Sequence, residues 1–124
     1  MDEYSLPPEV QRLITDALAS MDHVEVLFQL AQAKDATLER LVETVHITAT
    51  QLAKVLLDLE QARVITKDGA SYRVTQNSGD RAAIDAFVTA YNTRPVTLIR
   101  AVYARPSPVR SFADAFRVRR EDDR

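Results

Sequence analysis

The stretch of sequence that decides the fold is residues 45–75, "VHITATQLAKVLLDLEQARVITKDGASYRVT". Near its start, Thr48 and Gln51 have the spacing of a capping box, in which two side chains satisfy backbone N–H groups at the beginning of a helix. Ile47 before the cap and Leu52 after it are placed to form a hydrophobic staple. These residues predict a helix that begins at about residue 48 and extends to about residue 61.

The two sides of this predicted helix differ in polarity. Because successive residues are rotated by about 100°, four apolar residues fall on one side and five polar residues on the other. Leu57 lies at the edge of the polar side. We expect the apolar side to be buried and the polar side to face solvent or a partner. The apolar side consists of Leu52, Val55, Leu56 and Leu59, and the polar side of Thr50, Gln51, Lys54, Asp58 and Gln61.

A β-hairpin is predicted directly after this helix. The segments "RVIT" (63–66) and "SYRVT" (71–75) are rich in β-branched residues, and "KDGA" joins them. Asp68-Gly69 within that link is a strong signal for a tight hairpin turn.

Three helices are predicted before this stretch and three after it. Apolar residues recur at helical spacing in 7–20 and 22–33, and a short helix of about nine residues follows Thr37, its predicted N-cap. Beyond the hairpin, "NSGD" (77–80) supplies cap residues for a helix over 81–92, and Pro95 opens another over 95–104. Ser107 and Pro108 begin the last helix, over 109–120, where Phe112 and Phe116 must be buried against something.

Length and composition are those of one ordinary soluble domain. The chain has 124 residues, of which 46% are hydrophobic and 27% charged. It has no cysteine, which excludes disulfides, thiolate metal sites and cysteine nucleophiles. The first ten residues are acidic rather than basic, and no run of about 18 apolar residues occurs. We therefore expect a cytoplasmic protein without a membrane segment.

Charge is distributed unevenly along the chain. Residues 1–60 hold 11 acidic and 4 basic residues, whereas residues 61–124 hold 7 acidic and 12 basic residues. The arginines of the C-terminal third have three interpretations: a solvated surface, partners for the acidic N-terminal half, or a second nucleic-acid contact. We favour the second interpretation, either within one protomer or across a dimer.

Neither a metal site nor an active site is predicted. His23 and His46 are far apart in sequence, and Asp22 and Glu25 beside the first are most simply surface acids. No serine lies in a motif that would activate a nucleophile, and two glycines are too few for a phosphate-binding loop. We expect no enzymatic activity, no metal and no cofactor.

Residues 24–75, with three helices followed by a hairpin, resemble the winged helix-turn-helix transcriptional regulators of bacteria, in the broad company of the MarR-like and ArsR-like families. In this resemblance residues 48–61 are the recognition helix, residues 46–48 the turn before it, and "VITKDGASYRV" (64–74) the wing. The chain departs from the pattern in two places. Ala62-Arg63 stands where glycine is frequent after the recognition helix, and the wing carries few basic residues.

The resemblance implies a mostly α fold with a small β-hairpin wing, organised as one compact unit. Residues 1–79 would be the winged helix-turn-helix domain with its N-terminal helix. Residues 80–124 match no known module, but the apolar faces of the last three helices exceed what so small a domain needs, so we expect a C-terminal helical segment for packing and dimerisation. The resemblance also implies that the chain regulates transcription by inserting the recognition helix into the major groove of double-stranded DNA. A homodimer would place two such helices about one turn of DNA apart. The expected DNA-binding residues are Thr48, Thr50, Gln51, Lys54, Lys67 and Arg73.

Two other interpretations of the same residues stay open. The polar side of the helix and the charged hairpin residues are also what any solvated surface contains. Alternatively, the chain is a winged-helix interaction module that binds another regulator through its acidic N-terminal half and Leu57, with little or no DNA affinity.

Overall fold

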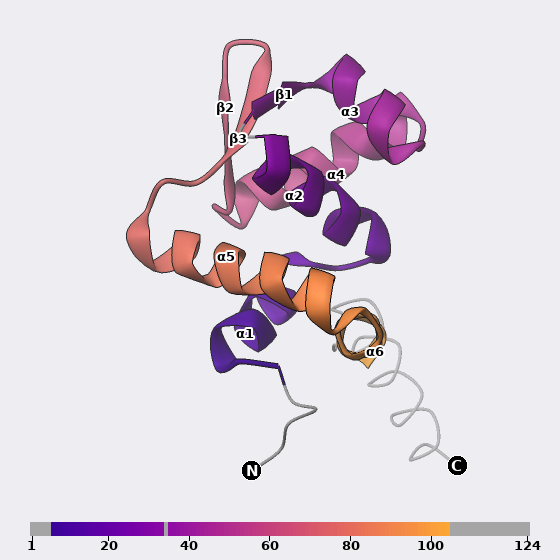
Figure 1. Cartoon of the computed structure of the whole chain (residues 1–124). Helices are drawn as coiled ribbons and strands as arrows, with labels where there is room; N and C mark the ends of the chain where they lie inside the picture. The colour runs from indigo at the N-terminus through magenta and orange to yellow at the C-terminus, as the bar shows by residue number, and fades with distance from the viewer. Residues whose placement is uncertain (1–5, 34, 105–124) are drawn as a thin grey trace, which may run out of the picture.

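The computed structural model describes residues 6–33 and 35–104, which form six α-helices and one small antiparallel sheet (Figure 1). This part of the chain is mostly helical, as predicted. The helix predicted over 109–120, with Phe112 and Phe116, lies outside the described residues. The elements are α1 (Pro8–Ala17), α2 (Met21–Ala33), β1 (Asp35–Thr37), α3 (Leu38–Val45), α4 (Ala49–Gln61), β2 (Ile65–Asp68), β3 (Ser71–Val74), α5 (Ser78–Thr93) and α6 (Pro95–Ala104).

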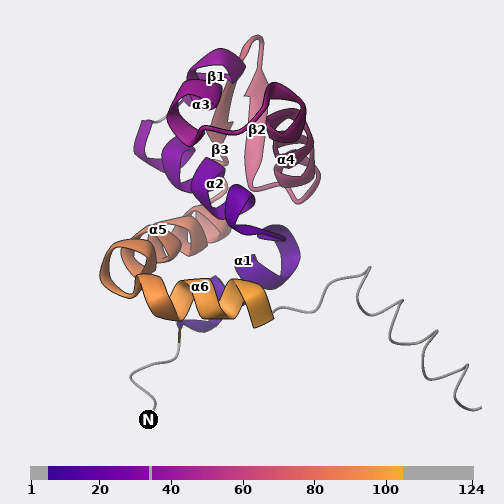
Figure 2. The ribbon, with the colours of Figure 1, turned by 90° about the vertical axis from the view of Figure 1, so that its right-hand side faces the viewer.

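The helices lie in two groups that share one hydrophobic core. Helices α2, α3 and α4 pack around the sheet at one end of the molecule, and α1, α5 and α6 form the other end (Figures 1 and 2). Helix α5 joins the groups because it packs against α1, α2 and α6. The N-terminal helix therefore contacts the C-terminal ones directly. Fully buried core residues include Val10, Leu18, Val24, Leu27, Leu30, Leu52, Leu59, Ile84 and Phe87.

The sheet has three strands in the order β1-β3-β2, one more than the two-stranded hairpin predicted from the sequence. Strand β1 pairs with β3 through Asp35↔Arg73, Ala36↔Tyr72 and Thr37↔Ser71. Its three residues are too few to show an alternating pattern, and Asp and Ala are uncommon in strands. This segment is extended because it pairs with β3, which is more than 30 residues away in the sequence.

The predicted hairpin is present, but its turn lies one residue later than the Asp68-Gly69 signal places it. Asp68 and Ser71 are the last paired residues, so Gly69 and Ala70 form a two-residue turn. Gly69 has a φ of 64°, in the left-handed region that glycine adopts without steric cost.

Both ends of α4 are bordered by a non-glycine residue in the left-handed region. His46 ends α3 with a φ of 65°, and Arg63 follows α4 with a φ of 67°. After Arg63, the Val64 N–H donates to the Leu59 carbonyl at 3.2 Å, the long backward bond of a Schellman helix end. The helix end that usually employs glycine is thus present, but an arginine occupies it at a cost of about 1–2 kcal/mol.

Candidate nucleic-acid interface

The predicted capping box is present at the start of α4. Thr48 Oγ1 accepts a hydrogen bond from the Gln51 N–H at 3.1 Å. In return, Gln51 Oε1 accepts from the Thr48 N–H at 3.4 Å and lies 3.3 Å from the Thr48 hydroxyl. Two backbone N–H groups at the helix start are therefore satisfied, which fixes where α4 begins.

The same bonds restrict what Gln51 can do at a DNA surface. A two-point contact with adenine needs the carboxamide oxygen to accept one hydrogen bond while its nitrogen donates another. In this structure that oxygen is turned back toward Thr48. Gln51 must leave the capping box before it can bind a base in this way, so its first role is to hold the helix start.

The outward side of α4 is formed by Thr50, Ala53, Lys54 and Leu57, which we call the α4 outer face. All four side chains are exposed, Lys54 with 78% and Leu57 with 53% of their accessible surface. On the other side of the helix, the predicted apolar stripe is buried. Two of the four residues are short, so a partner surface can approach the helix backbone closely at this face.

A hydrogen-bonded chain behind this face joins α4 to the start of α2. His23 is buried, with 6% of its surface exposed; its Nε2 lies 2.9 Å from Asp58 Oδ2 and its Nδ1 2.8 Å from Ser20 Oγ. In the neutral ring, Nε2 donates to the carboxylate and the serine hydroxyl donates to Nδ1. The helical period predicts that Asp58 lies on the polar side of α4, but the sequence gives no sign of this link because His23 and Asp58 are 35 positions apart.

Asp58 also lies near the cation of the α4 outer face. Lys54 Nζ is 3.9 Å from Asp58 Oδ2, one helical turn away. A contact of this length to a largely exposed lysine contributes little stability. Its consequence is electrostatic, because the carboxylate lowers the positive potential that Lys54 presents to an approaching phosphate.

The two predicted cations of the hairpin have different surroundings. Lys67 is exposed, and its Nζ lies 5.7 Å from the centre of the Tyr72 ring, within the range of a cation–π contact. Arg73 lies in the central strand, and its Nη2 contacts Asp68 Oδ2 at 3.4 Å. Of these two, Lys67 is the better placed to meet a phosphate.

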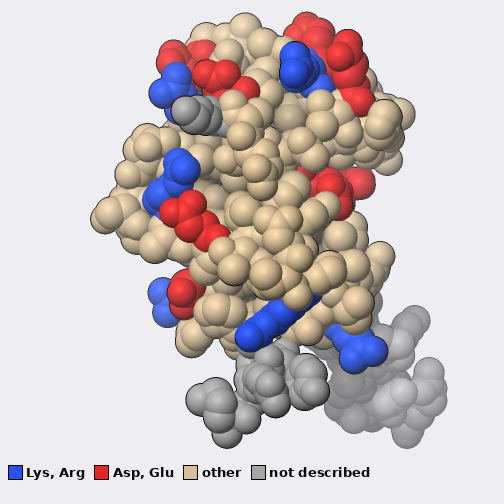
Figure 3. Space-filling model, viewed as in Figure 1, with Lys and Arg blue, Asp and Glu red and all other residues tan. Residues whose placement is uncertain are grey.

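The region that would face DNA has no excess of positive charge. Residues 38–74, from α3 through the hairpin, contain five acidic and five basic residues. Figure 3 shows the opposite face of the molecule, with α2 and α5 in front and α4 behind, and the Lys and Arg side chains coloured on it form no continuous stripe either. Long-range attraction to phosphates is therefore weak, and any binding to DNA depends on close contacts.

A second polar link joins α2 to α5. The Tyr91 hydroxyl donates to the Glu25 carboxylate, at 2.8 and 2.9 Å from its two oxygens, and the Tyr91 ring stacks on Phe28 at 3.7 Å. Burial, followed by the bond to Glu25, raises the pKa of Tyr91 from 10.0 to about 12. The interpretation of Glu25 as a simple surface acid is wrong, because this residue holds two helices together.

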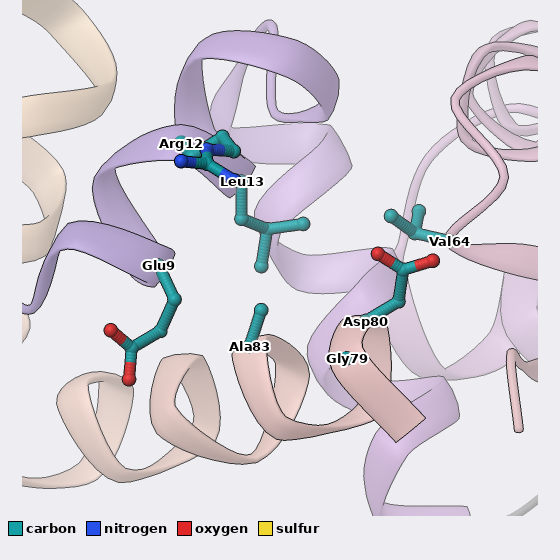
Figure 4. Close-up of a pocket in the computed structure, with 7 residues that line it drawn as sticks. All are labelled: Glu9, Arg12, Leu13, Val64, Gly79, Asp80 and Ala83. Carbon is teal, nitrogen blue, oxygen red and sulfur yellow. The ribbon is translucent and has the colours of Figure 1, made fainter. Parts of the chain in front are cut away.

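A small hollow lies between α1 and α5. It has a volume of about 240 Å³, below the usual range for ligand pockets. In Figure 4, Leu13 and Ala83 face each other across it, while the carboxylates of Glu9 and Asp80 lie at separate sides. These groups do not converge on one point, so they do not define a ligand.

The larger hollow, of about 440 Å³, lies beside the sheet, where Asp35, Arg73, Gln76 and Arg81 contribute to its lining. Within the described part of the chain, the buried Nε of Arg73 has no hydrogen-bond partner. The Asp35 carboxylate would repel an anion that the two arginines attract. Arg81 already forms an ion pair, with its Nε 3.3 Å from Asp85 Oδ1. The lining therefore does not define an anion site.

Neither a metal site, nor a membrane-spanning helix, nor a similar protein indicates a function for the described residues. Residues 6–33 and 35–104 contain no group of three His, Asp or Glu side chains arranged to hold a metal ion. In the same residues, no helix combines the length and apolar content needed to cross a membrane. Comparison with protein-family models, curated proteins and solved structures finds no match to this chain, so its own geometry carries the functional argument.

Proposed function

We propose that this chain is a winged helix-turn-helix regulator of transcription that binds double-stranded DNA with α4 in the major groove and the β2–β3 hairpin as the wing. The observation that carries the proposal is the α4 outer face, which is exposed along one side of a helix whose other side is buried. The preceding helix α3, the capped helix start and the following hairpin support it.

The contacts in this proposal come from a few side chains. Thr50 and Lys54 lie in the first half of α4, the part of a recognition helix that usually contacts base edges. The Thr50 methyl group suits a thymine methyl, and Lys54 suits guanine or a phosphate. Lys67 on the hairpin would contact the DNA backbone beside the groove.

The near-neutral surface implies a moderate affinity. If one protomer neutralises about four phosphates, the logarithm of the binding constant falls with the logarithm of salt concentration with a slope of about −3.6. A dimer would roughly double that slope and would match a palindromic site. Homodimerisation through the C-terminal segment, residues 80–124, is part of the proposal, and light scattering of the full chain tests it.

The test of DNA binding is fluorescence anisotropy of the full chain with labelled mixed-sequence duplex at several salt concentrations. Lys54→Glu and Lys67→Glu each reverse one charge at the proposed interface. Arg12→Glu makes the same change on α1, in the other group of helices. Salt-sensitive binding that the first two variants abolish and the third retains supports the proposal, whereas equal loss in all three contradicts it.

A second candidate function is binding of a protein partner by the same face. Leu57 is the observation that favours it, because a large apolar side chain at 53% exposure is better matched to a protein surface than to phosphates. The neutral charge of residues 38–74 agrees with this alternative. Absence of duplex binding even at low salt would favour the protein partner over DNA.

A further inference from the structure

The last described helix, α6, has an apolar side that no described residue covers. Leu98 and Val102 face the core, with 1% and 3% of their surface exposed. Val96, Ile99 and Tyr103 are exposed by 60%, 36% and 67%. Their spacing of three and four residues places them on one side of the helix, and we call them the α6 stripe.

The chain continues for 20 residues after α6, and that segment repeats the spacing of the α6 stripe. Val109, Phe112 and Phe116 are separated by three and four residues, as are Val96, Ile99 and Tyr103. Three large apolar residues at this period form one side of a helix, which needs an apolar partner. The α6 stripe is such a partner, with the same number of residues over the same length.

The two sets also match in register if the chain reverses direction between them. Pro106 lies midway between the two sets in the sequence. In an antiparallel arrangement with its reversal at Pro106, residues at equal or nearly equal distances before and after this proline face one another. Neighbouring apolar residues of both sets then meet along two turns of helix. The facing pairs are Tyr103 with Val109, Ile99 with Phe112, and Val96 with Phe116.

The connecting residues suit such a reversal. Residues 105–108 read Arg-Pro-Ser-Pro, and a proline disfavours helical structure in the residue before it. Antiparallel helices are commonly joined by two to five residues, so a link of this length is sufficient. A segment tethered so closely has an effective concentration of about millimolar, well above that of a second copy in dilute solution.

We propose that residues 109–116 of this chain dock antiparallel on its own α6 and cover the α6 stripe. The proposal does not rest on DNA binding, and its test does not use DNA. It leaves the homodimer to form through other parts of the C-terminal segment.

The experiment uses the absence of cysteine from the chain. A full-length variant with Ile99→Cys and Phe112→Cys places two thiols at a predicted facing pair. A matched variant with Ile99→Cys and Asp114→Cys moves the second thiol to the opposite side of the predicted helix. Both are oxidised mildly at low protein concentration, and their products are separated without reductant.

Faster formation of a disulfide within one chain in the 99/112 variant than in the 99/114 variant supports the proposal. A disulfide mainly between two chains overturns it and assigns the α6 stripe to a second copy. Equal rates in the two variants also overturn it.

A second measurement uses the absence of tryptophan. Phe116→Trp introduces a single tryptophan, whose emission should be blue-shifted and protected from a soluble quencher. Adding Val96→Asp, opposite it in the proposed register, should shift the emission to the red. Adding Asn92→Asp, an exposed position of α5 with the same change in charge, should not. Solvent-exposed emission without either addition contradicts the docking.

Discussion

At the scale of single residues, the carboxylate of Asp58 has two neighbours that differ in their access to water. It bonds to the buried His23 at 2.9 Å, and it lies 3.9 Å from the exposed Lys54. The lysine can exchange this contact for water, whereas the buried ring nitrogen has less access to solvent. The stabilising role of Asp58 is therefore the bond to His23.

We expect Asp58→Ala to lower the free energy of unfolding by about 1–3 kcal/mol, because it leaves a buried polar atom of His23 without its partner. Urea denaturation measures the change. Glu60→Ala is the control, since Glu60 is exposed on the same helix and should change stability by less than about 0.5 kcal/mol. Equal effects in the two variants would show that water replaces the carboxylate.

Tyr91 makes the stability of the protein sensitive to alkaline pH. Its pKa is about 12 in the folded chain and 10.0 without the surroundings of the fold. The unfolded chain therefore loses this proton first, and the stabilising contribution is complete below pH 10 and lost as pH rises toward about 12. Tyr91→Phe should remove this part of the pH dependence in unfolding curves.

The same substitution should cost about 1–2 kcal/mol at neutral pH, because Glu25 loses a hydrogen bond while the stacking on Phe28 is retained. Tyr103→Phe is the matched control, as its side chain is 67% exposed. A loss as large in the control would contradict the role assigned to the Glu25 bond.

At the scale of elements, Arg63 offers a direct test of how α4 ends. Its φ of 67° costs an arginine about 1–2 kcal/mol, whereas glycine adopts it freely but loses about 0.5–1 kcal/mol more backbone entropy on folding. The first effect is larger, so Arg63→Gly should stabilise the protein by up to about 1 kcal/mol in thermal or urea unfolding. Ala53→Gly, at an exposed position inside α4, should destabilise the protein by about 1 kcal/mol.

Elements defined by local sequence signals were predictable, and those that depend on distant partners were not. The start of α4 follows from Thr48 and Gln51, three residues apart, and the existence of the hairpin from the Asp68-Gly69 signal, although the turn itself lies at Gly69 and Ala70. Strand β1 carries no such signal of its own and exists because β3 pairs with it. The side of α4 that is exposed was predictable from its period, but the capping role restricts Gln51 more than the sequence suggested.

At the scale of the whole molecule, the links between helices decide how the α4 outer face is held, and these were invisible in the sequence. His23 with Asp58, and Glu25 with Tyr91, are 35 and 66 residues apart. The uneven charge of the two halves was plain from the sequence. The equal numbers of acidic and basic residues in 38–74 can be counted from the sequence as well.

The pairing of β1 with β3 has a further consequence, for the order in which the protein folds. Asp35 and Arg73 meet across 38 residues, and both α3 and α4 lie within the loop that they close. Closing a loop of this size loses chain entropy before the contacts inside it are complete. Helices α3 and α4 should therefore open together, as one cooperative unit, whenever this strand pair separates.

Ala36→Asp, which places a charge at a buried position of β1, should thus speed amide hydrogen exchange throughout α3 and α4 while the amides of α1, α5 and α6 keep their protection. Uniform acceleration in all helices would mean that the molecule opens only as a whole. If the unit opens separately, the three residues of β1, which are not part of the α4 outer face, control how often that face is assembled.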